Sequence, residues 1–549
     1  MKEKAVYRYL ISGVSTPVSA NTDEICNEAR IRMKRRGIDT RTLHFRLYKR
    51  SVDARRRNDV RFVSAVLVES GSPIPAAARE RLGLREWSDE KPACPHGTEP
   101  LGAPPLVVGM GPAGLFAALL LAENGYRPIL IDRGDNVEDR VRAVERFRQN
   151  AILDPESNIQ FGAGGAGTFS DGKLVTRIHD PYCRYVLETF RRFGAPEEIL
   201  MLAKPHIGTD VLRNVVSAIL SEIGRLGSRV IYRCRMDDFS ESADGTISVR
   251  TAAGDLRCGA LFLALGHSAR DTYRVLLEKQ FAIEPKPMSV GVRAEHLQSD
   301  IDRAMYGSFA GHPNLGHAEY ALSDTKGERG VYTFCMCPGG EVVPAASESG
   351  GLVVNGMSNH ARDGKNANAA VAVSLSCNDY ESVDGSRVLG AIALQRKIER
   401  AAFAAGGSDY AAPVTTLGDF LGKTHGSEPT RVVPSYRGGI VRVTDLAPVF
   451  PADVVRALRY AFASFGRSLE GFDAPDTVLT AAESRTSAPL RILRLPETMA
   501  AVGHDRVYPC GEGAGYAGGI TSAGVDGLRA ALAMMKRFGG PDENHGYGC

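Results

Sequence analysis

The sequence has few of the features that mark a metal, disulfide or membrane protein. Its ten cysteines are scattered and none stands in a CxxC pair, which argues against a zinc ribbon, an iron–sulfur cluster or a dithiol redox motif. Their spacing is also unlike a secreted disulfide framework, so we expect a reducing compartment. The uncharged stretch 106–122 has three glycines and a proline in its first half. That composition favours a strand, turn and helix over a membrane span.

The N-terminal stretch does not read as a signal peptide, because Arg8 interrupts its apolar part. We therefore predict a cytoplasmic protein with no membrane partner. The net charge of +3 is too small to imply a polyanionic partner for the whole chain. Residues 1–70 nevertheless carry 16 lysines and arginines against 8 acidic residues.

Residues 1–90 are predicted to form a small basic α+β domain, with a helix capped by Asn21 or Thr22. Its stretch "KRSVDARRR" suits either a nucleic-acid or acidic partner, or a solvated hairpin rim. We favour the rim, because no stacking aromatic residues are interleaved with the charges. Residues 91–105 contain five prolines and are predicted to be a linker.

The body of the chain opens on a dinucleotide-binding pattern. The predicted strand "PLVVG" runs into Gly109-Met-Gly111-Pro-Ala-Gly114, an apolar helix follows, and a second strand ends at Asp132, 23 residues after the first glycine. Gly111 would let the backbone approach a pyrophosphate, and the helix N-terminus would supply free N–H groups. Asp132 would accept hydrogen bonds from ribose hydroxyls. The pattern alone leaves FAD and NAD(P) both open.

Two further glycine loops follow, "FGAGGAGTFSDGKL" at 161–174 and "GEGAGYAGGI" at 511–520. The first has N–H groups and hydroxyls suited to phosphate and to ring edges. The second lies between a predicted strand and a helix that is expected to begin near Gly519–Thr521. An enzyme that binds only NAD has no need of this second, distant glycine site. The chain has no second strand–GxGxxG–helix unit.

The stretches "SNIQFGAGGAGTFSDGKL", "VYTFCMCPGGEVVPAASE", "NGMSNHARDGKNANAAVAVS", "ESRTSAPLRILR" and "YPCGEGAGYAGGITSAGVDG" resemble the bacterial family of uncharacterised FAD-dependent dehydrogenases from about residue 105 to the end. The strand ending at Gly266 resembles one in glutathione-reductase-like flavoproteins. The family more often has glutamate where this chain has Asp132. The resemblance implies an α/β fold with a Rossmann-like, two-dinucleotide-type FAD domain. That domain would be discontinuous, at 106–283 and 491–549, with a mixed-β substrate domain inserted at 284–490.

The resemblance also implies a set of FAD contacts, in which Glu512 holds a ribityl hydroxyl or, through water, the pyrophosphate. The helix beginning at Gly519–Thr521 would stabilise negative charge on the reduced ring. We expect the FAD to be held non-covalently. The implied contacts are Gly109, Gly111, Pro112, Ala113, Gly114, Asp132, Arg133, Gly164, Gly165, Ala166, Gly167, Thr168, Phe169, Met236, Gly266, Gly511, Glu512, Gly519, Ile520 and Ala523.

The segment 284–490 holds three weak catalytic candidates. Glu295 and His296 would point to opposite faces of a strand, and we expect His296 to be a surface residue rather than an acid–base group. Cys337 could form a reducible pair with Cys335, but two small buried residues are the favoured interpretation. Arg485 would either hold a substrate carboxylate or pair with Glu483.

Together these patterns predict an FAD-dependent oxidoreductase that transfers hydride between a small organic substrate and flavin N5. NAD(P)H would serve as a transient electron donor without a Rossmann domain of its own. The alternative is a flavin-bearing protein that binds or modifies RNA through the basic N-terminal domain.

Overall fold

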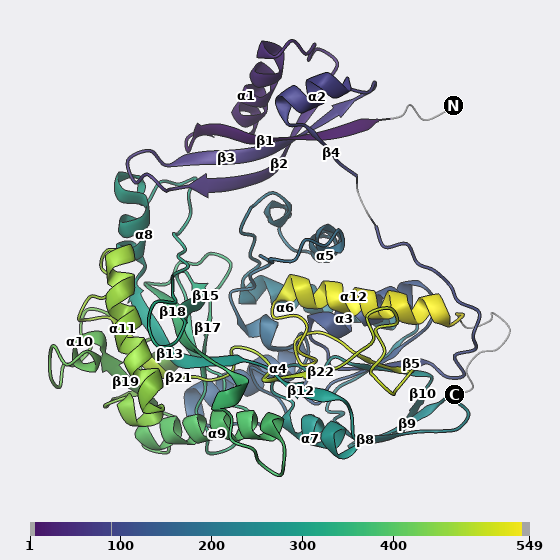
Figure 1. Ribbon diagram of the computed structural model, residues 1–549, viewed down its shortest axis with the longest axis vertical. Coiled ribbons are helices and arrows are strands. Elements are labelled where there is room, and N and C mark those ends of the chain that lie inside the picture. The colour runs from purple at the N-terminus through teal and green to yellow at the C-terminus, as the bar shows by residue number, and fades with distance from the viewer. Residues whose placement is uncertain (1–5, 89–90, 541–549) are drawn as a thin grey trace.

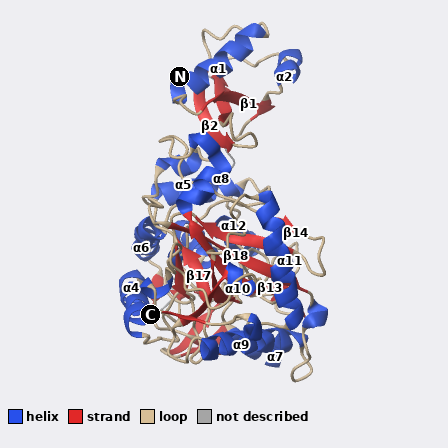
Figure 2. Cartoon of the chain, turned by 90° about the vertical axis from the view of Figure 1, so that its left-hand side faces the viewer, coloured by secondary structure: helices blue, strands red, loops and turns tan. Residues whose placement is uncertain are grey.

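The computed structural model describes residues 6–88 and 91–540, and Figures 1 and 2 show a small N-terminal domain standing on a larger body. The small domain is a four-stranded antiparallel sheet of order β2-β3-β1-β4 with two helices on one face. Its elements are β1 (Tyr7–Pro17), α1 (Thr22–Arg35), β2 (His44–Asp53), β3 (Arg61–Ser70), α2 (Ala76–Leu82) and β4 (Arg85–Glu86).

The N-terminal helix begins where the sequence predicts. Asn21 accepts from the Glu24 amide and Glu24 accepts from the Asn21 amide, a capping box that satisfies two otherwise unpaired donors. The stretch "KRSVDARRR" forms the end of β2 and the exposed turn before β3, as the hairpin interpretation requires. On the side away from its helices the sheet faces the body (Figure 1). There the Arg50 amide donates to the Met201 carbonyl at 2.7 Å.

A parallel sheet of order β23-β11-β5-β6-β7 forms the centre of the body. Four of its strands are fully or almost fully buried and uniformly apolar, because helices cover both faces of such a sheet. The strands are β5 (Pro105–Val108), β6 (Ile129–Ile131), β7 (Arg229–Ile231), β11 (Ala260–Leu263) and β23 (Val507–Pro509). The helices around them are α3 (Pro112–Glu123), α4 (Val137–Asn150), α5 (Tyr182–Arg192), α6 (Thr209–Arg225), α7 (Arg270–Glu278) and α12 (Ile520–Arg537).

The last helix of the chain packs directly on the first helix of the body (Figure 1). A Cβ added at Gly527 of α12 would lie 2.0 Å from the Ala113 carbonyl oxygen of α3, so the two helices cross with their backbones in contact. Beside the parallel sheet runs an antiparallel one of order β10-β9-β8, made of β8 (Met236–Glu241), β9 (Ile247–Thr251) and β10 (Gly254–Cys258).

A seven-stranded, mostly antiparallel sheet is inserted between β11 and β23, with the order β14-β15-β18-β13-β21-β19-β20. Its strands are β13 (Met288–Leu297), β14 (Ser323–Asp324), β15 (Val331–Cys337), β18 (Asn366–Leu375), β19 (Ala412–Thr416), β20 (Val441–Val443) and β21 (Val478–Glu483). The helices that accompany it are α8 (Gln298–Tyr306), α9 (Arg387–Ala405), α10 (Leu417–Phe420) and α11 (Ala452–Ser468). Two ribbons complete the body, β12 (Ile283–Pro285) with β22 (Leu490–Ile492) and β16 (Glu341–Pro344) with β17 (Val354–Met357).

The α/β class predicted from the sequence is confirmed, as are the strand, turn and helix at 105–123. Helix α12 begins within the predicted window, at Ile520. Within the described residues, no helix has both the length and the hydropathy needed to cross a bilayer.

Candidate cofactor site

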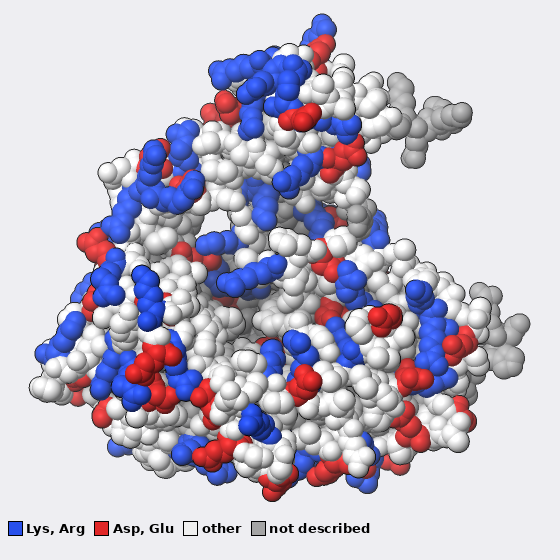
Figure 3. Space-filling model, viewed as in Figure 1, with Lys and Arg blue, Asp and Glu red and all other residues white. Residues whose placement is uncertain are grey.

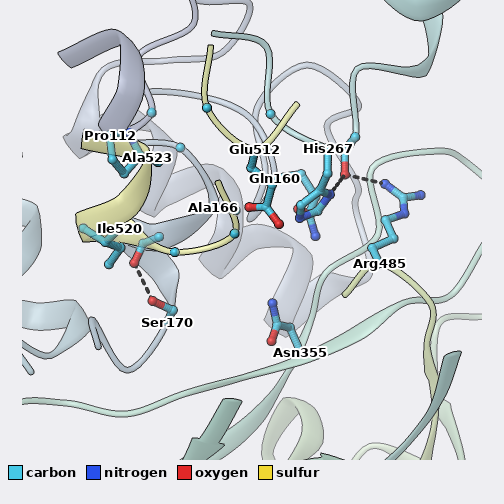
Figure 4. Close-up of a pocket in the computed structure, with 18 of the residues that line it drawn as sticks. Pro112, Gln160, Ala166, Ser170, His267, Asn355, Arg485, Glu512, Ile520 and Ala523 are labelled. Carbon is cyan, nitrogen blue, oxygen red and sulfur yellow. Dashed lines mark hydrogen bonds between the residues drawn. The ribbon is translucent and has the colours of Figure 1, made fainter. Parts of the chain in front are cut away.

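One cavity of about 480 Å³ collects all three glycine loops (Figure 4). It lies beyond the carboxyl ends of β5, β6, β11 and β23, the edge at which open parallel sheets bind ligands. Its opposite wall comes from β15, β17 and β21 of the inserted sheet. Glycine loops that are far apart in the sequence therefore border the same space.

The first loop is shaped by a glycine that no other residue can replace. Gly109 has φ of +106°, and a Cβ there would lie 2.2 Å from the carbonyl oxygen of Ala264, at the end of β11. Helix α3 then begins at Pro112 with Gly111 as an N-cap that has no side-chain hydrogen bond. Its first N–H groups are thus available to an anion in the cavity.

Asp132 lines the cavity, but its carboxylate already has backbone partners. One oxygen accepts from the Met110 amide and the other from the Gly134 amide, each at 2.9 Å. The carboxylate therefore ties the first glycine loop to the end of β6. Arg133 also lines the cavity, where it pairs with Asp271 and stacks over Phe161 at 4.4 Å.

Only part of the second loop faces the cavity. Gly165, Ala166 and Gly167 line it, as does Ser170, which donates to the Gly167 carbonyl at 2.6 Å. Gly114, Gly164, Thr168 and Phe169 are not among the residues that line it, so their contacts with FAD stay a prediction. The Thr168 carbonyl accepts from Thr209, and the Phe169 ring packs under Arg140 and Arg213 at 4.8 and 4.6 Å. The Thr209 hydroxyl and the Phe169 ring thus help to hold the loop in place.

The third loop brings an unpartnered carboxylate and a second open helix end. The Gly519 N-cap of α12 has no side-chain hydrogen bond, and Gly519, Ile520 and Ala523 line the cavity. Among the described residues, the Glu512 carboxylate has neither a hydrogen bond nor an ion pair, and it points into the cavity (Figure 4). Burial raises the pKa of Glu512 to about 7, against a smaller opposing effect of Lys286. Met236, Gly266 and Gly511 also line the cavity.

The raised pKa predicts a pH dependence for the apoprotein. The unfolded chain loses the Glu512 proton near the ordinary carboxyl pKa of 4.5, whereas the folded chain keeps it until about pH 7. The contribution of Glu512 to the free energy of unfolding is therefore fully present below pH 4.5, and it falls as the pH rises to about 7. We expect Glu512→Gln to remove that fall. Urea unfolding of wild-type and variant apoprotein between pH 4.5 and 8 measures it, and parallel curves would contradict the assignment.

Three cavity residues carry no signal in the sequence that would have singled them out: His267, Gln160 and Asn355. The Nδ1 atom of His267 lies 3.0 Å from the Ser268 hydroxyl, which also accepts from Arg485 at 3.1 Å. Burial, with Arg485 and Arg270 nearby, lowers the pKa of His267 to about 3. Because the Ser268 hydroxyl oxygen accepts a hydrogen bond from Arg485, its O–H can donate a hydrogen bond to Nδ1 of His267. The neutral ring then carries its proton on Nε2, and this N–H is the donor left for the cavity.

Gln160 and Asn355 each present an unused polar atom. The Gln160 amide nitrogen donates to the Ala345 carbonyl at 3.1 Å, and its buried carbonyl oxygen has no partner among the described residues. The Asn355 carbonyl oxygen accepts from Arg293 at 2.9 Å, so its amide nitrogen remains for the cavity. The cavity thus offers acceptors and donors at fixed positions along its length.

The structure corrects both alternatives for Arg485. Its guanidinium makes two hydrogen bonds of 2.9 Å to Glu399, rather than to Glu483 or to open space. Glu399 is shared with Arg270, and together the two arginines hold its pKa well below the ordinary carboxyl range. Arg485 lines the cavity but has both prongs occupied.

The expectation for His296 is also corrected. His296 is buried rather than on the surface, with Nε2 2.9 Å from the Phe472 carbonyl, and it lies outside the cavity. Cys335 and Cys337 do not share a strand face, because β15 has a bulge there and Cys335 has φ of +44°. Cys337 is buried as expected, whereas Cys335 is exposed within the cavity. All nine described cysteines are free.

This arrangement fits an extended dinucleotide. Two helix N-termini without caps suit a pyrophosphate and an electron-rich ring, and the unpartnered Glu512 and Gln160 oxygens suit hydroxyl and N–H donors. The first and third loops are in contact, since a Cβ on Gly511 would lie 2.7 Å from that of Ala113.

Residues 287–486 match the family model described as "FAD-dependent protein, C-terminal domain-like". An uncharacterized protein of Clostridium beijerinckii (strain ATCC 51743 / NCIMB 8052) is 42% identical over 496 residues, which cover 90% of this chain and 92% of the relative.

Solved structures with some similarity include CtdE in complex with FAD, which is 11% identical at a TM-score of 0.30, with 78% of this chain and 84% of that chain covered. The amino acid oxidase NikD is 12% identical at a TM-score of 0.32, with 81% of this chain and 99% of that chain covered. Likenesses at these TM-scores say nothing about this chain's substrate. The family match and the relative do decide its membership: the chain belongs to this family of uncharacterised FAD-dependent proteins, and FAD is its cofactor.

Proposed function

We propose that the protein is an FAD-dependent oxidoreductase that exchanges a hydride between a small organic substrate and flavin N5. The observation that carries the proposal is the single cavity shared by the loops at 109–113 and 511–523. In this proposal the parallel sheet is a discontinuous, Rossmann-like FAD domain. The inserted seven-stranded sheet supplies the substrate side.

When bound, FAD supplies two-electron redox chemistry. The N-terminal N–H groups of α3 would hold the pyrophosphate, and those of α12 would favour negative charge at the far end of the cofactor. Glu512 and Gln160 would orient it through acceptor oxygens. Met236 would meet the adenine and Asp132 the ribose, with Asp132 also keeping its two backbone partners. The strands β15, β17 and β21 would exclude water from the substrate side.

His267 is the cavity residue best placed to act on the substrate. Its ring is held through Ser268 by Arg485, which is itself fixed on Glu399. With a pKa lowered to about 3, it stays neutral at physiological pH and would donate a hydrogen bond from Nε2–H to the substrate.

The two cysteines are not proposed as a redox pair. The Cys337 thiol donates to the Cys335 carbonyl at 3.3 Å, and burial raises the pKa of the Cys337 thiol. Thiols held in the protonated form are poor nucleophiles. The RNA-binding alternative is not carried forward either, because the family match describes FAD-dependent proteins and no contact favours RNA.

The visible spectrum of the purified protein tests cofactor binding, and anaerobic mixing with NADH, NADPH and small organic donors tests turnover. We expect a yellow protein whose flavin is bleached by at least one donor. A colourless protein that takes up no FAD would overturn the cofactor assignment for this cavity. Flavin that no donor reduces would point instead to a non-catalytic flavoprotein.

A further inference from the structure

A second cavity, of about 430 Å³, lies between the N-terminal sheet and helix α5. Tyr48, Lys49 and Trp87 line it from the sheet side, and residues 178–181, 183 and 184 line it from the body. Figure 3 shows a hollow between the small domain and the body with lysine and arginine side chains around it. The volume is within the range of small-molecule sites.

Consecutive residues of one chain segment line the two cavities. Lys173, Val175 and Arg177 line the cofactor cavity, and the next residues, Ile178 and His179, line the second one. The segment is anchored to the cofactor helix, because Thr521 of α12 donates to the Leu174 carbonyl at 2.8 Å. The two cavities therefore border one continuous chain segment, residues 173–181.

Aromatic rings form one side of the second cavity. Trp87 is the single tryptophan of the chain, and its ring meets that of Tyr48 edge to face at 6.0 Å. The guanidinium of Arg184 lies over Tyr48 at 5.6 Å, and both rings remain partly exposed. Exposed aromatic surface beside a cation is suited to a flat base, which stacks on the ring and is held by the charge.

The charge around the second cavity favours an anion. Lys49 is exposed, and neither it nor Arg177 has an ion pair within the described ranges. The one acidic lining residue, Asp180, is neutralised by Arg529 at 2.6 Å. The unpaired Lys49, at the second cavity, and Arg177, at the first, complement a phosphate chain.

We propose that the second cavity binds a nucleotide, with the base against Trp87 and Tyr48 and the phosphates toward Lys49 and Arg177. The occupant with this chemistry that also carries a reactive end toward the first cavity is a pyridine dinucleotide. The chain has no second strand–GxGxxG–helix unit to hold one. The donor role rests on the proposed function, whereas nucleotide binding does not.

Tryptophan fluorescence, excited selectively over tyrosine, tests the binding directly in the FAD-loaded protein, because Trp87 is the single tryptophan and lines the cavity. ADP and AMP are the probes, and we expect each to give a saturable change with a dissociation constant of about 1 mM or below. Lys49→Ala should weaken ADP by about tenfold, the value of one charged hydrogen bond. Lys397→Ala, an exposed lysine on α9, is the matched control and should change nothing. No saturable change with either probe, or equal affinities of the two variants, would overturn the site.

The donor role has its own readout. ADP should raise the KM for NADH or NADPH in flavin reduction without changing kcat, and Lys49→Ala should act in the same direction. If ADP binds but does not compete with NADH or NADPH, the nucleotide site stands and the proposal that it holds the electron donor is overturned. An RNA oligonucleotide that binds about a hundredfold more tightly than ADP would overturn the proposal in favour of a nucleic-acid surface.

Discussion

Gly109→Ala is expected to give a protein that purifies with less than about a tenth of the wild-type FAD. The new Cβ would lie 2.2 Å from the Ala264 carbonyl oxygen, and the residue would be held at φ of +106°. Since β5 and β11 are paired neighbours in the sheet, the clash can be relieved only by moving the first glycine loop away from β11. The loop and the start of α3 would then no longer face the cavity. The ratio of flavin to protein absorbance measures the loss.

A matched control separates this clash from backbone strain. Gly254 has nearly the same φ, +109°, but nothing within 4 Å of an added Cβ. Gly254→Ala should therefore cost only the strain, about 1–2 kcal/mol of unfolding free energy, and should keep its FAD. If Gly109→Ala retains as much FAD as Gly254→Ala, the close approach of β5 and β11 is not what shapes the site.

Arg293→Met is expected to lower the free energy of unfolding by about 3–5 kcal/mol, the cost of leaving a buried charge without its partner. Arg293 is completely buried and bonds Glu483, Asn368, Asn355 and the Cys335 carbonyl, each at 2.9 Å. Burial raises the pKa of Glu483, and the charge of Arg293 lowers it. Loss of the Arg293 charge should therefore raise the Glu483 pKa further. A raised carboxyl pKa makes stability fall as the pH rises, and the deficit should be larger at pH 8 than at pH 5.

Two further variants keep this prediction decisive. Arg303→Met breaks an ion pair of 3.7 Å in which the arginine is 74% exposed, and it should cost less than about 1 kcal/mol. Adding Glu483→Gln to Arg293→Met should recover part of the loss, because the unpaired charge is removed. Urea unfolding at a fixed FAD concentration compares all four proteins, and equal costs for Arg293→Met and Arg303→Met would contradict the buried pair.

The backbone of the cofactor site could be predicted because its signals are local. A strand, a turn that needs a positive φ and a helix start are each decided by neighbouring residues, so the loops at 109 and 511 could be recognised from their sequence. The sequence did not show which part of the second glycine loop lines the cavity: Gly165, Ala166 and Gly167 do, whereas Thr168 and Phe169 do not. An irregular loop lacks the side-chain periodicity of a helix or strand, so its sequence does not show which residues face the cavity.

The amino-acid sequence by itself determined the α/β class, the positions of the glycine loops and the start of α12. Only the tertiary structure decided that Arg485 pairs with Glu399, that His296 is buried and that His267 enters the cavity. The physical reason is range. Backbone sterics and helix caps act over a few residues, whereas the partner of a buried charge is chosen by which distant elements pack around it, and leaving that charge unpaired costs several kcal/mol.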